Sequence, residues 1–267
     1  MRTALTIAGS DSGGGAGVQA DLKTFAAHGV YGASAITAIT AQNSRGITAL
    51  ESISADLVTA QIEAIAADFS IDAVKTGMLP TAAIVEAVGA AVRALELPLL
   101  VVDPVMSSTS GHTLTGDEAV AAMRTELLPH AAVVTPNIPE AAALAGIAIV
   151  SDADRREAAR RIAAHGPRAV IIKGGHVDGA SIIDLLFERG TFTEFRTERI
   201  DGAATHGTGC TFAAALAAHL ALGHSLAAAI PQIQMYIAGA IRHAPRLGQG
   251  NGPMAHLWNL VEREAPG

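Results

Sequence analysis

Short apolar runs alternate with amphipathic stretches along most of this chain. The runs are bounded by glycine, proline or polar residues, and continuous apolar runs of this kind are typical of strands that are buried on both faces of a sheet. The pattern predicts strands at Ala4–Ala8, Ala33–Thr40, Ala73–Lys75, Leu99–Val102, Ala132–Thr135 and Ala169–Lys173.

The stretches between these runs have the periodicity of helices that bury one apolar face. In one of them Leu57, Ile62 and Ile65 fall on a single face, and Ser54 is a suitable N-cap just before it. Helices are therefore expected at Val18–His28, Ala55–Phe69, a stretch ending near Leu95, Asp117–Leu128 and Asp154–His165. This alternation predicts an α/β fold of three layers (α/β/α), in which helices cover both faces of a mainly parallel central sheet.

The last third of the chain has a different pattern. Ser181–Phe187 and Thr191–Thr197 alternate apolar and polar residues on either side of Glu188-Arg189-Gly190, which predicts a β-hairpin. The periodicity after this hairpin is helical, and the expected helices run from Thr208 to about Gly223, over Leu226–His243 and over about Pro253–Arg263. Because no linker, repeat or low-complexity stretch divides the chain, residues 1–267 are expected to form a single domain.

Composition limits the class of protein. Half of the 267 residues are hydrophobic and 16% are charged, which is enough apolar material for a large core. The net charge of −7, without a basic stripe, argues against a nucleic-acid partner. No apolar run reaches the roughly 18 residues of a membrane span, and one cysteine excludes an intrachain disulfide. With no signal-peptide pattern at the N-terminus, we expect a cytoplasmic protein that acts on small molecules.

A polar side chain stands at the carboxyl end of nearly every predicted strand. These residues are Asp11, Gln42, Lys75, Asp103, Asn137 and Lys173. Parallel strands end at the same edge of a sheet, and open α/β sheets bind ligands at that edge. The sequence therefore predicts that the six side chains belong to one site.

Two glycine-rich loops each lead directly into a predicted helix. One covers residues 9–17, and the other is Thr205-His206-Gly207-Thr208-Gly209-Cys210. The N–H groups and positive dipole end of a helix bind anions, and glycines let a phosphate approach the backbone. The second loop therefore predicts an anion site that holds the only cysteine. The first loop lacks the Walker and dinucleotide motifs, and a tight crossover turn explains it equally well.

Several of these polar residues also have a purely structural interpretation. Asp103 is suited either to binding a metal ion or to forming an Asp-Pro turn. Asn137 and Glu140 share a helix face, as ligands would, but a helix cap produces the same spacing. The Gln42 amide can donate and accept at a heterocycle edge, although a loop glutamine is more often plain surface.

Taken together, the residues favour phosphoryl transfer. That reaction requires an N–H cradle, a cation, Mg²⁺ and a group that accepts the hydroxyl proton. Lys173 would supply a point charge for phosphate oxygens, and Cys210 is the candidate base because a helix N-terminus lowers the pKa of a thiol. Two alternatives stay open: Cys210 is a buried packing residue, or it forms a nucleophilic pair with His206.

Seven motifs resemble one enzyme family. They are Gly9–Lys23, Thr40–Asn43, Val74–Met78, Asp103–Met106, Thr135–Glu140, Lys173–His176 and Thr205–Cys210. They are similar to motifs of the hydroxymethylpyrimidine/phosphomethylpyrimidine kinases of thiamine biosynthesis, which belong to the ribokinase-like superfamily. The matches occur in order between residue 5 and about residue 225, and they imply a ribokinase-like fold.

The resemblance also implies a reaction with ATP and Mg²⁺ as cofactors. 4-Amino-5-hydroxymethyl-2-methylpyrimidine would be phosphorylated on its alcohol, and the monophosphate would then be converted to the diphosphate. Cys210 would replace the aspartate base of most sugar kinases. That exchange suits the alcohol step, whereas a phosphate acceptor is already largely ionised at pH 7.

The same resemblance assigns roles to individual residues. The expected catalytic group, an anion hole with its base, is Gly207, Thr208, Gly209 and Cys210. The expected substrate pocket, in which Gln42 recognises the pyrimidine edge, is Gln42, Gly9, Asp21, Met78 and Val105. The residues expected to bind ATP and phosphate are Lys173, Asn137, Thr205 and His206, and those expected to hold Mg²⁺ are Glu140 and Asp103.

One loop departs from the family pattern. Many relatives carry a lysine after Asp-Pro-Val-Met, where this chain has Ser107-Ser108-Thr109-Ser110, so the closure of this loop over the substrate stays open. The oligomeric state is open too, with a homodimer as one candidate. Rival functions are a pyridoxine/pyridoxal kinase, a catalytically idle pyrimidine-binding protein and a cysteine hydrolase.

Overall fold

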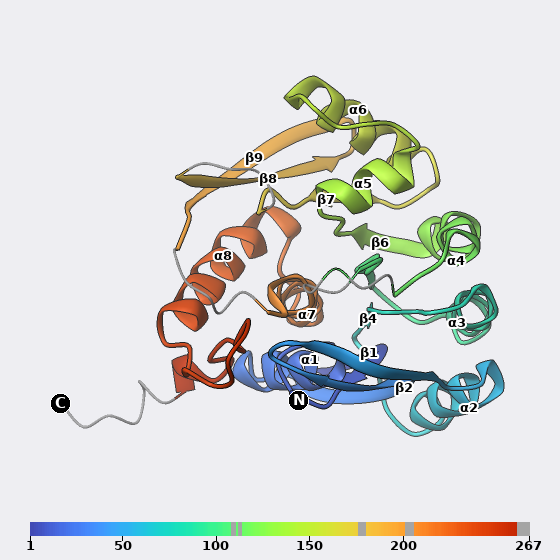
Figure 1. Cartoon of the computed structure of the whole chain (residues 1–267). Coiled ribbons are helices and arrows are strands. Elements are labelled where there is room, and N and C mark those ends of the chain that lie inside the picture. Colours follow the sequence, from blue (N-terminus) through green and yellow to red (C-terminus); the bar gives the residue numbers. More distant parts are fainter. Residues whose placement is uncertain (108–110, 112–113, 176–179, 201–205, 261–267) are drawn as a thin grey trace.

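One sheet forms the centre of the structure (Figure 1). The structure is a computed structural model that describes residues 1–107, 111, 114–175, 180–200 and 206–260. Within these residues nine strands join in the order β3-β2-β1-β4-β5-β6-β7-β8-β9. Their bounds are β1 Thr3–Asp11, β2 Tyr31–Asn43, β3 Gly46–Ser52, β4 Ala73–Thr76, β5 Leu100–Val102, β6 Ala131–Val134, β7 Ala169–Ile172, β8 Ser181–Glu188 and β9 Thr191–Glu198.

The middle of the sheet is parallel and its two edges are antiparallel. Strands β2, β1, β4, β5, β6 and β7 pair in parallel. Strand β3 pairs antiparallel with β2, and β8 and β9 extend the other edge as the expected antiparallel hairpin. The α/β fold with a mainly parallel sheet is therefore confirmed, and the carboxyl ends of the parallel strands share one edge.

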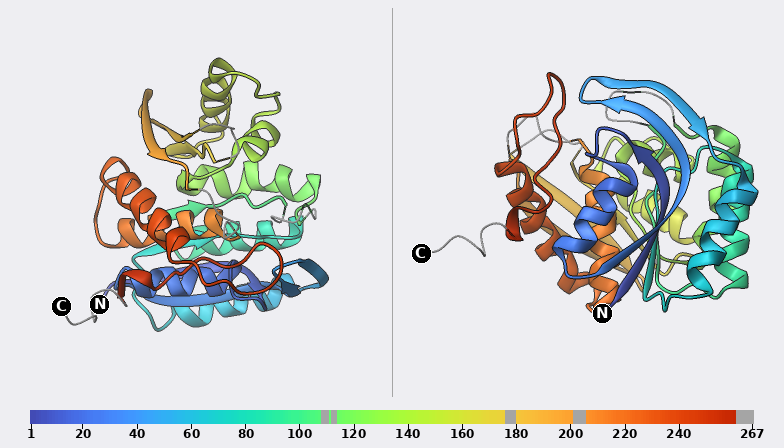
Figure 2. Two further views of the ribbon diagram at one scale, coloured as in Figure 1. Left: turned by 60° about the vertical axis from the view of Figure 1, so that its left-hand side comes forward. Right: turned by 90° about the horizontal axis from the view of Figure 1, so that it is seen from below.

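Helices cover both faces of the sheet (Figure 2). One face carries α1 (Gly17–Ala27), α7 (Thr208–Ala221) and α8 (Leu226–Arg242). The other carries α2 (Ala55–Ala66), α3 (Ala82–Ala94), α4 (Asp117–Ala122), α5 (Ile138–Ala145) and α6 (Asp152–Ala163). Ser54 caps α2 as expected, because its side chain accepts from the Leu57 N–H. No helix in the described part of the chain is both long and apolar enough to span a membrane.

The two faces are filled by alternate residues of the same strands. In β1, Leu5 and Ile7 belong to the core beneath α2 and α3, whereas Ala4 belongs to the core beneath α1 and α7. On that second face α7 is rich in alanine, and Ala213–Ala215, Ala217 and Ala218 are fully buried. Small side chains let the α7 backbone lie close to the sheet.

Several elements differ from the sequence-based expectation, and among them the short helix α5 was not expected. Strand β2 continues to Asn43, and β3 follows after a short turn; β3 escapes prediction because most of its side chains are exposed and it has no apolar face. The helix expected over Asp117–Leu128 is α4 followed by a π-turn, Met123–Leu127, and a short 3₁₀ turn. The last helix begins at Trp258, not Pro253, within the described residues.

Candidate active site

A cavity of about 580 Å³ lies at the carboxyl edge of the parallel strands. Most of the residues that the sequence assigns to a site line it: Gly9, Gln42, Met78, Asp103, Val105, Asn137, Glu140, Lys173, His206, Gly207, Thr208, Gly209 and Cys210. Asp11 and Lys75 line it too, so all six strand-end side chains meet there. Asp21 does not line the cavity, and Thr205 lies outside the described residues.

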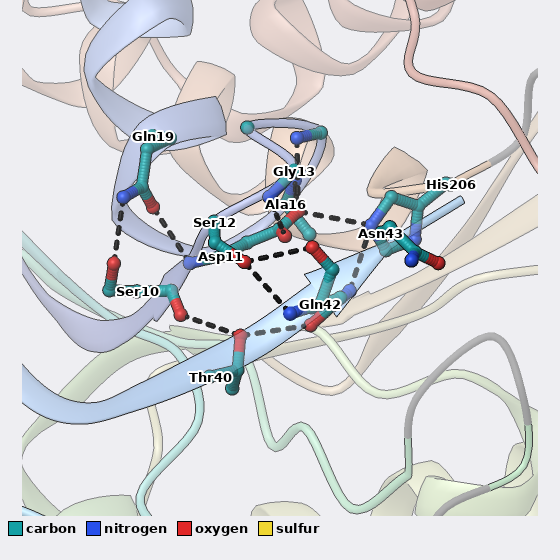
Figure 3. Close-up of polar contacts among 12 residues, drawn as sticks. Ser10, Asp11, Ser12, Gly13, Ala16, Gln19, Thr40, Gln42, Asn43 and His206 are labelled. Atoms are coloured by element: carbon teal, nitrogen blue, oxygen red, sulfur yellow. Dashed lines mark hydrogen bonds and ion pairs between the residues drawn. The ribbon is translucent and has the colours of Figure 1, made fainter. Parts of the chain in front are cut away.

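Asp11 organises the glycine loop that follows β1 (Figure 3). Its Oδ1 accepts from the Gly13 N–H at 2.8 Å, and its Oδ2 accepts from the N–H groups of Gly15 and Ala16 at 3.0 and 2.8 Å. Burial opposes the charge of Asp11, but His206 and these donors outweigh it and lower the pKa of the carboxyl. This loop is therefore a turn built around its own carboxylate, with three N–H groups already occupied.

Gln42 lies near the end of β2, beside His206. The amide nitrogen of Gln42 is 3.1 Å from His206 Nε2, and its amide oxygen is 3.3 Å from Thr40 Oγ1. His206 Nε2 is also 3.1 Å from Asp11 Oδ2. These contacts join His206 to the residues expected in the substrate pocket, although the sequence assigned it to ATP or phosphate.

A buried ion pair lies behind the cavity wall. Lys75 Nζ donates to Asp21 Oδ2 at 2.8 Å, and Asp21 also accepts from the Thr6 hydroxyl at 2.6 Å. Burial alone would lower the pKa of Lys75, but the charges of Asp21, Cys210 and Asp103 outweigh it and raise the pKa. Only Lys75 of this pair lines the cavity, while Asp21 Oδ1 is buried without a hydrogen-bond partner among the described residues, so the substrate contact expected of Asp21 stays a prediction.

A second ion pair links the carboxyl ends of β5 and β7. Lys173 Nζ donates to Asp103 Oδ1 at 2.9 Å. Asp103 Oδ2 is buried and has no hydrogen-bond partner among the described residues. An unpartnered carboxylate oxygen is costly to bury unless a ligand binds it, so this atom favours the metal-binding interpretation of Asp103 over a turn alone.

Asn137 and Glu140 begin α5 as a capping box. Asn137 Oδ1 accepts from the Glu140 N–H at 2.9 Å, and Glu140 Oε2 accepts from the Asn137 N–H at 2.8 Å. The structural interpretation of their spacing is thus correct, yet both residues also line the cavity. Burial raises the pKa of Glu140 to about 7 against the opposing charge of Lys173. A bound cation would favour the ionised form of this carboxyl.

The N-terminus of α7 forms the cradle that the sequence predicts. Gly207 has a φ of 82°, and a Cβ at this position would overlap the carbonyl oxygen of Gly15, so the turn requires glycine. A Cβ on Gly209 would lie 3.3 Å from Lys173 Nζ, which places that cation beside the helix terminus. The first N–H groups of a helix have no partner within the helix, and with the lysine they suit a phosphoryl group.

Cys210 lies in the first turn of α7, but its thiol is not activated there. Burial raises the pKa of the Cys210 thiol to about 11, although Lys75 opposes the shift. The protonation state that the sequence left open is therefore that of a thiol with a raised pKa, because burial and the nearby carboxylates of Asp103 and Asp21 outweigh the lowering expected from a helix N-terminus. The thiol is protonated at neutral pH when no ligand is bound.

Asp184 and Gln234 are among the polar residues of the cavity that escape the sequence analysis. Asp184 Oδ1 accepts from the Gly174 N–H at 2.9 Å, and its Oδ2 accepts from Gln234 Nε2 at 2.8 Å. These bonds tie the loop after β7 to α8 and so help to set the position of Lys173. The available signal is the place of Asp184 inside the otherwise apolar run Ile182–Leu186, since a carboxylate on a buried strand face needs partners.

Comparison with known proteins places this site in a family. A family model described as phosphomethylpyrimidine kinase matches residues 11–255. The hydroxymethylpyrimidine/phosphomethylpyrimidine kinase of Rhizobium meliloti is 50% identical over 257 residues, which are 95% of this chain and 96% of that protein. This chain belongs to the phosphomethylpyrimidine kinase family. The resemblance drawn from the motifs is confirmed.

Solved structures agree with this family and its fold. A phosphomethylpyrimidine kinase from Clostridium difficile has a TM-score of 0.80 and 41% identity, with coverage of 90% of this chain and 100% of that chain. An ADP complex of Bacillus subtilis pyridoxal kinase has a TM-score of 0.89 and 39% identity, with coverage of 98% and 99%. Phosphomethylpyrimidine kinases therefore share this fold with at least one kinase of another ring alcohol.

The family site fits a cation bound together with phosphates. Among the described residues, no group of three or more His, Cys, Asp or Glu side chains is arranged to hold a metal ion alone. Mg²⁺ in phosphoryl-transfer sites needs only one or two carboxylates, because phosphates and water complete its shell. Asp103, with its unpartnered Oδ2, and Glu140 meet that need. Ser107 of the divergent loop lines the cavity, and residues 108–110 lie outside the described chain.

Proposed function

We propose that this protein phosphorylates 4-amino-5-hydroxymethyl-2-methylpyrimidine with ATP and then phosphorylates the resulting monophosphate. The observation that carries the proposal is a single cavity with two kinds of recognition group. Gln42 supplies an amide suited to a heterocycle edge, while the N-terminus of α7 and Lys173 supply groups suited to phosphates. The relatives named above are kinases of such ring alcohols or of their phosphates.

The phosphate-binding groups act by holding charge in place. N–H groups at the start of α7 bind the phosphoryl group during transfer, and Lys173 balances its negative charge. Gly207 and Gly209 carry no Cβ, so phosphoryl oxygens reach the backbone. Asp103 and Glu140 would hold Mg²⁺, which when bound neutralises phosphate charge.

Cys210 is the base of the first step only. It accepts the proton of the substrate alcohol, and Lys75 favours the thiolate that this role requires. Because the thiol pKa is raised to about 11, the rate of the first step should increase with pH above neutrality. The monophosphate is already largely ionised at pH 7 and needs no base in the second step.

Single-turnover reactions followed by mass spectrometry test this function. With the pyrimidine alcohol, ATP and Mg²⁺, we expect the monophosphate to appear first and the diphosphate second, with one ADP released per transfer. If a folded sample forms neither product, the kinase function is refuted and an idle pyrimidine-binding protein becomes the better description.

A second candidate is phosphorylation of pyridoxal. It is favoured by the solved structure of a pyridoxal kinase that covers 98% of this chain at 39% identity. Values of kcat/KM for the two ring alcohols, measured side by side, separate the candidates. We expect the aminopyrimidine to have the higher value, and the opposite order would make pyridoxal the main substrate.

A further inference from the structure

Both ends of the Gln42 amide are held by protein groups. His206 Nε2 lies 3.1 Å from one end and Thr40 Oγ1 lies 3.3 Å from the other. His206 Nε2 is also 3.1 Å from Asp11 Oδ2, and the Thr40 hydroxyl donates to the Ser10 carbonyl oxygen at 2.9 Å. Figure 3 shows these contacts as a continuous chain from Asp11 to Ser10. An amide oxygen and nitrogen exchange places by a half-turn, so the partners decide the orientation.

Asp11 decides the direction of the hydrogen bonds in this chain. Its carboxylate accepts from three N–H groups of its own loop, so it is ionised and acts only as an acceptor. His206 must therefore donate its Nε2 proton on this side, and that nitrogen has no lone pair left for an amide N–H. The amide oxygen consequently faces His206 and shares the single Nε2 proton with Asp11 Oδ2 in a bifurcated hydrogen bond. The amide nitrogen faces Thr40, whose own proton is donated to Ser10.

We propose that His206 is a positioning residue for the ring alcohol, which fixes the amide orientation of Gln42 while Asp11 fixes His206. This inference rests on the proposed function, because it specifies how Gln42 recognises its substrate. The alternative orientation would bring two donors together at His206, and in a buried polar network such a mismatch is costly. His206 and Asp11 are both well buried, with side-chain exposures of 13% and 4%, so water does not relieve it.

The fixed amide presents a defined pair of groups to the cavity. After its contacts with His206 and Thr40, the amide keeps one oxygen lone pair and one N–H, and Gln42 lines the cavity. The edge of a 4-aminopyrimidine carries the complementary pair, since the amino group donates and the adjacent ring nitrogen accepts. Only one placement of the ring satisfies both bonds when the amide cannot turn. The orientation therefore sets the direction in which the hydroxymethyl group points.

Steady-state kinetics of three variants test this role. His206→Leu removes the donor, His206→Gln keeps a side-chain N–H, and Thr40→Val removes the hydroxyl while keeping the shape. We expect His206→Leu and Thr40→Val to raise KM for the aminopyrimidine alcohol about tenfold or more, with kcat changed less than about threefold and KM for ATP unchanged. His206→Gln should restore most of the affinity. The exposed His130→Gln is the matched control and should match the wild type.

An analogue without the 4-amino group provides a second readout. It lacks the donor that the fixed amide oxygen accepts, so its KM should rise less than about threefold in the same variants. In addition, Gln42→Ala combined with His206→Leu should have the KM of Gln42→Ala alone, because His206 acts through Gln42. Additive effects, or an equal rise for both compounds, would overturn the inference.

The outcomes separate this inference from the proposed function. If the His206 variants raise KM for ATP but not KM for the aminopyrimidine, His206 binds the nucleotide, as expected from the sequence. Thr40→Val tests the amide orientation even if neither His206 variant folds. If the wild type shows no turnover, the proposed function fails, and dissociation constants from calorimetry then make the same comparison among the variants. Unchanged constants in all of them would refute the positioning role alone.

Discussion

Two buried ion pairs, Lys75–Asp21 and Lys173–Asp103, lie at or behind the wall of the cavity. Lys75 and Asp21 have no exposed side-chain surface, and Lys173 is 13% exposed beside Asp103. Each lysine balances a carboxylate that would be costly to bury alone. The chain has 18 basic residues and uses arginine for nearly all of them, so two of its few lysines are found where a compact ammonium group is needed.

Replacing Lys75 with methionine should destabilise the protein by about 3–5 kcal/mol, because Asp21 would remain as an unpaired buried charge. The free energy of unfolding in urea measures this cost. Lys75→Met combined with Asp21→Asn removes both charges and should recover a large part of the loss. A double variant no more stable than Lys75→Met would contradict the ion-pair interpretation.

Cys210→Ala should slow phosphorylation of the alcohol by about 10²–10⁴-fold and phosphorylation of the monophosphate by less than about tenfold. Only the first acceptor has a proton that the enzyme must remove. Single-turnover rates for each acceptor measure the two effects separately. Equal losses would leave Cys210 as a packing residue.

The wild-type pH profile provides an independent check on the same thiol. Because the Cys210 pKa is raised to about 11, the thiolate fraction grows about tenfold per pH unit between pH 7 and 9. The rate of the first step should follow this increase, while the second step should stay nearly flat. A first step that is independent of pH over this range would argue against thiolate as the base.

At the scale of elements, helix α7 packs its alanines in the core and places its N-terminus in the cavity. Alanines on its inner face let it lie flat on the sheet, and Gly207 lets the preceding turn contact Gly15 on the neighbouring loop. The cradle is therefore produced by packing as well as by the helix terminus itself. The capping box of α5 also serves two purposes, because Asn137 and Glu140 begin the helix and both line the same cavity.

Gly207→Ala should cost at least about 2 kcal/mol more than Gly29→Ala, although both residues have a positive φ, of 82° and 72°. An added Cβ on Gly29 meets no atom within 4 Å, so the substitution there strains only the backbone, at about 1–2 kcal/mol. At Gly207 the Cβ would collide with the Gly15 carbonyl oxygen and displace α7. Urea unfolding and kcat measure the two effects, and similar values at both positions would show that the contact is not tight.

At the scale of the whole molecule, buried histidines make stability depend on pH. His219 Nδ1 lies 2.7 Å from His224 Nδ1, and the His219 ring packs edge-on against His28, the C-cap of α1. Burial, with a smaller effect of these two histidines, lowers the pKa of His219 to about 4, and burial lowers that of His256 to about 4. An unfolded histidine titrates near 6.5, so between about pH 6.5 and 4 the unfolded chain binds more protons. Stability therefore falls as pH decreases through this window.

Acidification from pH 7 to 5 should lower the free energy of unfolding by roughly 2 kcal/mol for each such histidine. In His219→Gln this fall should be smaller than in the wild type, whatever the stability of the variant at pH 7. Urea unfolding at the two pH values measures the slope, and the exposed His130→Gln serves as the control. The same slope in all three proteins would show that His219 does not contribute.

Local pattern predicted most of the framework correctly. The parallel strands, the hairpin at Ser181–Glu198 and most helices follow from periodicity, and the elements that were missed are those without it. Strand β3 is an exposed edge, and α5 is a short helix that begins at a Pro-Asn-Ile-Pro turn. The choice of site residues followed from the common direction of parallel strands, which is why nearly all of them line one cavity.

The sequence by itself determined the layered fold, the sheet edge at which the cavity lies and the family, because apolar periodicity and glycine motifs are local features. Only the tertiary structure decided how the polar residues act. Asp21 pairs with Lys75 across 54 positions, and His206 joins Gln42 across 164. The raised pKa of Cys210 likewise depends on burial and on carboxylates from other strands. Hydrogen bonds and pKa values depend on distances and dielectric surroundings, and in these cases both are set by residues far away in the chain.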